Sequence, residues 1–211
     1  MSYVCATLAH ALRRQGKAVL VFFCGQHAGV DDADGLQGPQ GLLRSLVAQL
    51  VLVLVQNGWM GEGQEVPVGM PVDGMNMGGW SGEGGGCGYD VMEECEEEPG
   101  VSLGDLCGVF YWLLGLVPRE TSVVCLVDGM SYYEREYWRE DYEIVVGMFG
   151  RIVQDPGLGG FLKVLMTSPT VSQGLPEEVP HQRIALRGLR AGGAASERAF
   201  RAAVRTRDWM E

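Results

Sequence analysis

The sequence predicts an α/β fold with a mainly parallel β-sheet. Two largely apolar segments, Ala18–Cys24 and Ser122–Val127, have the length and the β-branched content of strands that are covered on both faces. Segments with helical periodicity separate the predicted strands, and this alternation implies crossover connections between parallel strands. The chain has 211 residues, of which 46% are hydrophobic, so it can fill a core of its own.

The first part of the chain predicts a helix, a strand and a second helix. Ser2–Gln15 has apolar residues at helical spacing and ends at a glycine, after two arginines that suit the helix dipole. The strand Ala18–Cys24 follows, and after a polar loop Gln40–Val55 forms a long apolar helix. Arg44 and Gln49 interrupt its apolar run, which is also short for a bilayer, so we expect a buried helix.

Residues 57–100 differ in composition from the rest of the chain. They contain thirteen glycines, ten acidic residues and no Lys or Arg, and so they account for most of the net charge of -11. A segment of this kind cannot bury enough apolar surface to offset the entropy cost of ordering it. We therefore expect a long disordered insertion.

The elements predicted after the insertion again alternate between helix and strand. In order they are a helix within Val101–Val117 with capping-box spacing between Ser102 and Asp105, the strand Ser122–Val127, a helix over Arg135–Gln154, a third strand within Phe161–Pro169, a fourth short strand at Arg183–Leu186 and a C-terminal helix over Ala194–Thr206. We divide the chain into the first part of the α/β domain (1–56), the insertion (57–100), the remainder of that domain (101–190) and the C-terminal helix (191–211).

Asp128 is the first polar residue after the apolar run Ser122–Val127, and Thr167 and Ser168 occupy the same position after the third strand. Ligands of parallel sheets bind at the carboxyl ends of the strands. A carboxylate at such an end is typical of the Walker B motif, in which the acid holds Mg²⁺ beside nucleotide phosphates. Asp is also common simply as the first residue of a loop, so this pattern alone leaves both interpretations open.

The order of the motifs indicates a family. The initial helix and buried strand, followed by GLLRSLVAQL, VVCLVDGMSYYE and FLKVLMTSP, resemble the nucleotide-binding domain of NACHT-like STAND P-loop NTPases, in particular the fungal nephrocystin-3-like N-terminal type. The resemblance covers most of the chain and omits the insertion. It implies a P-loop NTPase-like three-layer sandwich that binds ATP or ADP with Mg²⁺. It also implies that Asp128 is the Walker B aspartate and metal ligand, and that Thr167 and Ser168 end the sensor strand.

The sequence departs from the family pattern at the phosphate-binding loop. A G-x-x-x-x-G-K-[ST] loop normally lies just ahead of the first helix, but this sequence has none, and Met1–Val4 resembles the body of that helix. We therefore expect a domain that is truncated before this loop or lacks it, with the first strand of the sheet missing. The next carboxylate after Asp128 is as far away as Glu134, and Pro169 stands where many relatives have Arg. Efficient ATP hydrolysis is not expected.

Three functions remain open at this point. We expect a truncated or degenerate STAND/NACHT-type domain that acts as a signalling or scaffold module with little or no ATP hydrolysis. The first alternative is a fragment of an active ATP- or GTP-binding NTPase whose Walker A loop lies upstream of Met1. The second alternative is an unrelated α/β protein-interaction domain.

Cysteine content and charge indicate the cellular location and the class of partner. Six cysteines without C-x-x-C spacing, and no recognisable signal peptide, predict a reduced, intracellular and cytoplasmic setting. The acidic balance argues against nonspecific nucleic-acid binding by the chain as a whole. We also expect no specific nucleic-acid binding and no membrane contact, with other protein domains as partners and an open oligomeric state. The aromatic side chains of 132–142 predict an amphipathic helix that packs on the sheet, with a partner-binding surface as the alternative.

Overall fold

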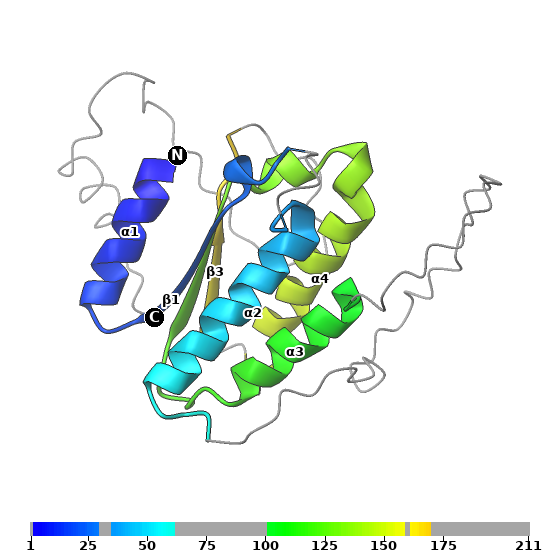
Figure 1. Cartoon of the computed structure of the whole chain (residues 1–211). Helices are drawn as coiled ribbons and strands as arrows, with labels where there is room; N and C mark the ends of the chain where they lie inside the picture. Colours follow the sequence, from blue (N-terminus) through cyan, green and yellow to red (C-terminus); the bar gives the residue numbers. More distant parts are fainter. Residues whose placement is uncertain (1, 30–34, 62–100, 159–160, 170–211) are drawn as a thin grey trace. The chain divides into compact units, whose positions relative to one another are not determined.

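The computed structural model describes residues 2–29, 35–61, 101–158 and 161–169 (Figure 1). The chain divides into two units, Met1–Pro180 and His181–Glu211, and the second unit lies outside the described residues. The predictions for most of the insertion 57–100, for the strand Arg183–Leu186 and for the C-terminal helix also fall outside them.

Three parallel strands form one sheet in the order β1-β2-β3. These are β1 (Ala18–Phe23), β2 (Val123–Asp128) and β3 (Leu162–Met166). The central strand β2 pairs with β1 from Ala18↔Val123 to Phe23↔Asp128, and with β3 from Val123↔Leu162 onward. The predicted α/β class and the predicted parallel sheet are confirmed.

Helices cover both faces of the sheet (Figure 1). They are α1 (Ser2–Arg14), α2 (Gly38–Gln56), α3 (Leu103–Gly115) and α4 (Arg139–Gln154). Figure 1 shows α1 on one face, with α2 and α4 on the other and α3 packed outside against them. The β1-to-β2 connection contains α2 and α3, and the β2-to-β3 connection contains α4, so helices join the parallel strands as crossover connections require.

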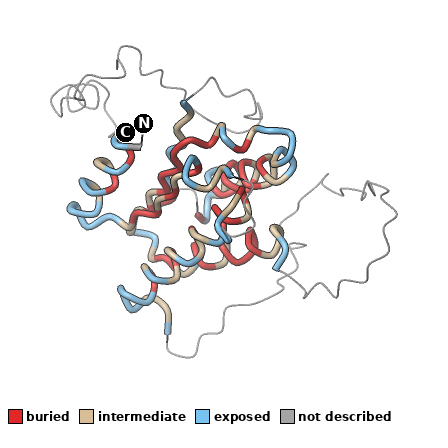
Figure 2. Tube along the Cα trace, turned by 45° about the horizontal axis from the view of Figure 1, so that its top comes forward, coloured by how far each residue is buried: buried red, intermediate tan, exposed pale blue. Residues whose placement is uncertain are grey.

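The alternation of side chains along each strand divides the core in two. Leu20, Phe22, Cys125 and Val127 belong to a large cluster with α2, α3 and α4. Residues of the opposite parity join a small cluster with α1, in which Ala9, Val19 and Leu126 are buried. Figure 2 shows the buried residues along the strands and on the inner sides of the helices.

α2 is a core helix. By length and composition alone it could cross a membrane, so the prediction that its apolar run is too short for a bilayer is wrong. It is the one helix of that kind in the described part of the chain, and such a helix is weak evidence for a span. A row of its leucines has 0% exposed surface, namely Leu42, Leu43, Leu46, Leu50 and Leu54. The predicted burial of this helix is confirmed.

The start of α3 follows the predicted capping box. Ser102 Oγ accepts a hydrogen bond from the backbone N–H of Asp105 at 3.1 Å. In return, the backbone N–H of Ser102 donates to Asp105 Oδ2 at 3.2 Å. Two amides that helix geometry leaves unpaired are satisfied in this way, although Asp replaces the more usual Glu.

The helix predicted over Arg135–Gln154 begins later, at Arg139. Arg135 has an extended backbone with ψ 151°, and a 3₁₀ turn over Glu136–Trp138 precedes α4. The Trp138 ring lies so close to Gly38 that a Cβ built there would approach it within 2.5 Å. Packing of this large ring against the start of α2 therefore overrides the helical pattern of the sequence.

Candidate functional site

Asp128 and Thr167 meet at the carboxyl edge of the sheet. Asp128 ends β2, Thr167 directly follows β3, and Thr167 Oγ1 donates a hydrogen bond to Asp128 Oδ1 at 2.5 Å. Parallel strands that pair in register end at the same edge, which is why residues 39 positions apart come together. The structure thus places these two predicted site residues side by side.

Backbone hydrogen bonds fix this arrangement. The amide of Thr167 donates to Val127 O at 2.9 Å, and Thr167 O accepts from the amides of Gly129 and Met130 at 3.0 and 2.9 Å. Thr167 Oγ1 also accepts from the amide of Gly129 at 3.1 Å. We call Asp128, Gly129 and Thr167 the strand-end clasp, because together they hold the ends of β2 and β3.

Gly129 has a backbone conformation that the clasp depends on. Its φ of +81° lies in the left-handed region, which residues with a Cβ atom rarely adopt. A Cβ at this position would also approach Tyr132 Cδ2 at 2.9 Å. The glycine that follows Asp128 therefore allows both the turn and the close approach of the Tyr132 ring.

Cys5 of α1 is the third side chain at Asp128. Its thiol donates to Asp128 Oδ1 at 3.4 Å, and Cys5 has no exposed surface while Asp128 is 5% exposed. Burial, with the nearby Asp128 charge, raises the pKa of the Cys5 thiol to about 12, so the thiol stays protonated and acts as a donor. Sequence reasoning missed Cys5, since nothing local signals a contact across 123 residues.

The position of Cys5 also orients α1 at the site. Cys5 lies in the first two turns of α1, so the amino-terminal end of this helix lies at the edge of the sheet that carries Asp128 (Figure 1). The first turns of a helix carry a partial positive charge from the peptide dipoles. This end of the sheet therefore combines a buried carboxylate with a helix terminus that favours anions.

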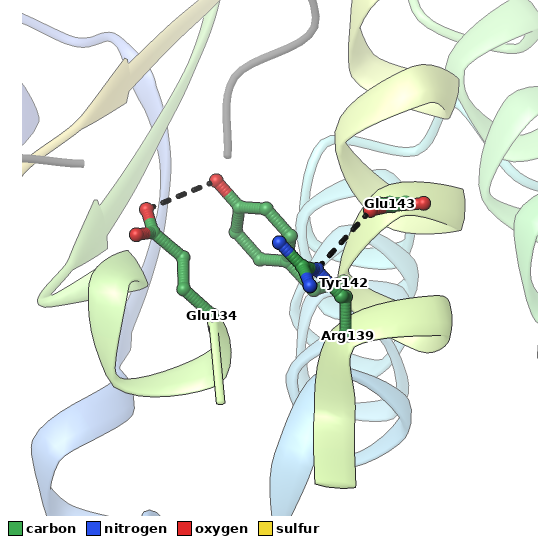
Figure 3. A network of polar contacts seen from close by, with 4 residues as sticks. All are labelled: Glu134, Arg139, Tyr142 and Glu143. Carbon is green, nitrogen blue, oxygen red and sulfur yellow. Dashed lines mark hydrogen bonds and ion pairs between the residues drawn. The ribbon is translucent and has the colours of Figure 1, made fainter. Parts of the chain in front are cut away.

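The predicted site residue Ser168 and the carboxylate Glu134 are not part of the clasp as defined above. Ser168 is partly buried one residue beyond Thr167. Glu134, the next carboxylate after Asp128, is directed toward α4, where its Oε1 accepts a hydrogen bond from Tyr142 Oη at 3.4 Å (Figure 3). Arg139 and Glu143 form a separate ion pair at 3.7 Å on the exposed side of α4.

A groove of about 220 Å³ lies between α1 and β1. Its lining residues are Ala6, Ala9, His10 and Arg13 from α1, with Val21 and Phe23 from β1. Val21 and Phe23 have the same parity as Val19, which packs on α1, and Phe23 is the register partner of Asp128. One end of the groove therefore adjoins the clasp.

The side chains that meet at Asp128 fit a hard cation only in part. Asp128 and Thr167 offer oxygen ligands of the kind that Mg²⁺ prefers, whereas the Cys5 thiol is a soft donor. Among the described residues, no group of three or more His, Cys, Asp or Glu could hold a metal ion. A cation at Asp128 would therefore take most of its ligands from water and from bound phosphate, which is common for Mg²⁺.

Comparisons with known proteins do not identify a family for this chain. A scan against protein-family models, a search of curated proteins and a search of solved structures each found no match. The resemblance to NACHT-like domains therefore depends on the sequence motifs alone.

Proposed function

We propose that this chain is a degenerate STAND/NACHT-type nucleotide-binding domain that acts as an intracellular signalling or scaffold module with other protein domains as partners. The observation that carries the proposal is the buried Asp128 carboxylate at the carboxyl end of the central strand, bonded to Thr167 from the end of the neighbouring parallel strand. This is the position at which open α/β sheets bind ligands. Asp128 is the candidate ligand of Mg²⁺, and ATP or ADP is the candidate nucleotide.

The same contacts explain why nucleotide binding is expected to be weak. Asp128 Oδ1 already accepts hydrogen bonds from Thr167 and Cys5, so a cation that coordinates this oxygen directly must displace at least one of them. Leaving a buried donor unpaired costs about 1–3 kcal/mol, which corresponds to about 5- to 150-fold in affinity. A site of this kind suits a module that responds to nucleotide weakly or not at all, with little or no hydrolysis.

Calorimetric titration of the purified chain with Mg·ATP and Mg·ADP tests the proposal. We expect weak, Mg²⁺-dependent binding that Asp128→Asn removes, with no measurable ATP turnover. Glu143→Gln is the matched control, because it makes the same acid-to-amide change on the exposed side of α4. Micromolar affinity with turnover would contradict the degenerate site, and binding that survives Asp128→Asn would remove the role of Asp128. Complete absence of binding would favour an α/β protein-interaction domain.

A second candidate is an active ATP- or GTP-hydrolysing domain whose phosphate-binding loop is encoded upstream of Met1. The observation that favours it is the contact of Cys5 with Asp128, because a loop that preceded α1 would reach this carboxylate. Sequencing of transcripts and of the DNA 5′ of Met1 tests this candidate. An in-frame G-x-x-x-x-G-K-[ST] motif would support it, and an in-frame stop codon directly upstream would reject it.

A further inference from the structure

The groove between α1 and β1 lies within reach of a ligand bound at Asp128. Phe23 is the register partner of Asp128, and Val21 lies two residues further along β1 on the same face. Two residues of a strand span about 7 Å. A molecule that placed one end at the clasp could therefore extend along β1 into the groove.

The floor and the near wall of the groove are apolar. Val21 and Phe23 form the floor, and Ala6 and Ala9 line the side of α1 that faces it. Ala6 is exposed, so its small side chain is what leaves this part of the groove open. A flat, largely apolar ring system suits these surfaces better than a charged group does.

Polar recognition in the groove comes from side chains. The amide and the carbonyl of Val21 are both bonded to the Gln49 side chain, each at 2.9 Å, so they are already satisfied. His10 and Arg13 are exposed at the rim of the groove. The Arg13 guanidinium donates a 3.2 Å hydrogen bond to Val19 O of β1, which fixes the position of this side chain. These two residues supply hydrogen-bond donors next to the apolar floor, and none of the described residues that line the groove is acidic.

We propose that this groove is the subsite for the base of a nucleotide whose phosphates lie at Asp128. The inference rests on the proposed function and adds the location of the nucleoside. The volume of about 220 Å³ supports a single ring system and not a whole nucleotide, since sites that enclose larger ligands measure about 300–1,000 Å³. The base packs on Phe23 and Val21 while His10 and Arg13 donate to its edge.

Separate probes for the two halves of the ligand test the inference. Adenosine without metal reports on the groove, and Mg·pyrophosphate reports on the clasp, each measured by titration monitored with NMR. Ala6→Leu fills the groove, and Ala11→Leu is the matched control because Ala11 is exposed on the same helix but does not line the groove. We expect Ala6→Leu to weaken adenosine binding by about tenfold or more, and Ala11→Leu to leave it unchanged.

The outcomes for the groove and for the clasp are distinguishable. If adenosine does not bind, or binds equally well to Ala6→Leu, the base subsite is wrong, whatever Mg·pyrophosphate does. If Ala6→Leu abolishes adenosine binding while Mg·pyrophosphate binds neither the wild type nor Asp128→Asn, the result supports the base subsite in the groove. It contradicts the phosphate site at Asp128. Loss of Mg·pyrophosphate binding in Asp128→Asn, with adenosine binding retained, supports both halves of the site.

Discussion

The two faces of the sheet differ in how they are covered. On one face, α2, α3 and α4 enclose a large cluster that takes in side chains from all three strands. On the other face, the described residues form a small buried cluster of Ala9, Val19 and Leu126, and the same face carries Cys5, Asp128 and the groove. Neighbouring residues of a strand point to opposite faces. A single strand such as β2 can therefore contribute core residues to one face and the candidate site residue Asp128 to the other.

The largest expected effect compares a leucine on each face. Leu46 of α2 has 0% exposed surface, and Leu46→Ala is expected to lower the free energy of unfolding by about 2–5 kcal/mol through lost burial and a cavity. Leu12 of α1 is only partly buried, so Leu12→Ala is expected to cost about 1 kcal/mol. Urea unfolding measures both, and equal losses would contradict the division of stability between the two faces.

The second prediction concerns the strand-end clasp. Thr167→Val preserves the shape of the side chain but removes the hydroxyl that bonds to Asp128 Oδ1 and Gly129 N. We expect a loss of about 1–3 kcal/mol, because a buried carboxylate loses a donor. Thr7→Val is the control, since the Thr7 hydroxyl bonds to Tyr3 O on the exposed side of α1. A loss in urea unfolding no greater than that of Thr7→Val would show that the clasp is not structural.

The third prediction compares two glutamines of α2. Gln49 pairs with both the amide and the carbonyl of Val21 at the outer edge of β1, whereas Gln40 makes one exposed bond to Val101 O. Gln49→Leu is expected to cost about 1–2 kcal/mol and to open this edge to strand pairing with another molecule. Gln40→Leu is expected to do neither. Unfolding measurements and light scattering against concentration check both effects, and identical behaviour of the two variants would contradict the role of Gln49.

The smallest expected effect is at the link between α3 and the end of α4. Tyr111 Oη donates to Asp155 Oδ2 at 2.6 Å, and this bond lowers the pKa of Asp155 and raises the pKa of Tyr111. Both groups are partly exposed, so Tyr111→Phe is expected to cost only about 0.5–1 kcal/mol at neutral pH.

The pH dependence of this effect follows from the two shifts. The contribution of Asp155 is present above its unfolded pKa of 3.8 and is lost as the pH falls through the lower folded pKa. The contribution of Tyr111 is present below its unfolded pKa of 10.0 and is lost as the pH rises through the higher folded pKa. The stability difference between wild type and Tyr111→Phe should be constant between these limits. A difference that varied across neutral pH would point to another titrating group.

The sequence predicts the parts of the molecule that local pattern determines. The apolar run that ends at Asp128, the parallel sheet and the capping box of Ser102 and Asp105 are all found in the structure. Contacts across the sheet are different in kind. Cys5 reaches Asp128, and Gln49 reaches Val21, only after α1 and α2 have packed, so no spacing in the sequence records either contact.

At the start of α4, the local pattern of the sequence predicts a helix that the structure does not form. The alternating charges and aromatic residues after Glu134 have helical character, yet the segment forms 3₁₀ turns until Arg139. Tyr133 is buried with 0% exposure, and its ring lies edge-on to that of Trp138 at 6.4 Å between centroids. Burial of Tyr133, with the packing of the Trp138 ring against it and against Gly38, favours this backbone, and helix propensity is too weak to oppose it.

The pairing of β1 with β2 has a consequence for the length of the chain between them. Ala18 of β1 pairs with Val123 of β2, although α2, α3 and the connection between them lie between these two strands in the sequence. For flexible connections the entropy of loop closure rises only with the logarithm of length, so doubling the length costs about 0.6 kcal/mol. A flexible linker inserted between α2 and α3 that doubled the length of this connection would therefore cost the sheet only about 0.6 kcal/mol.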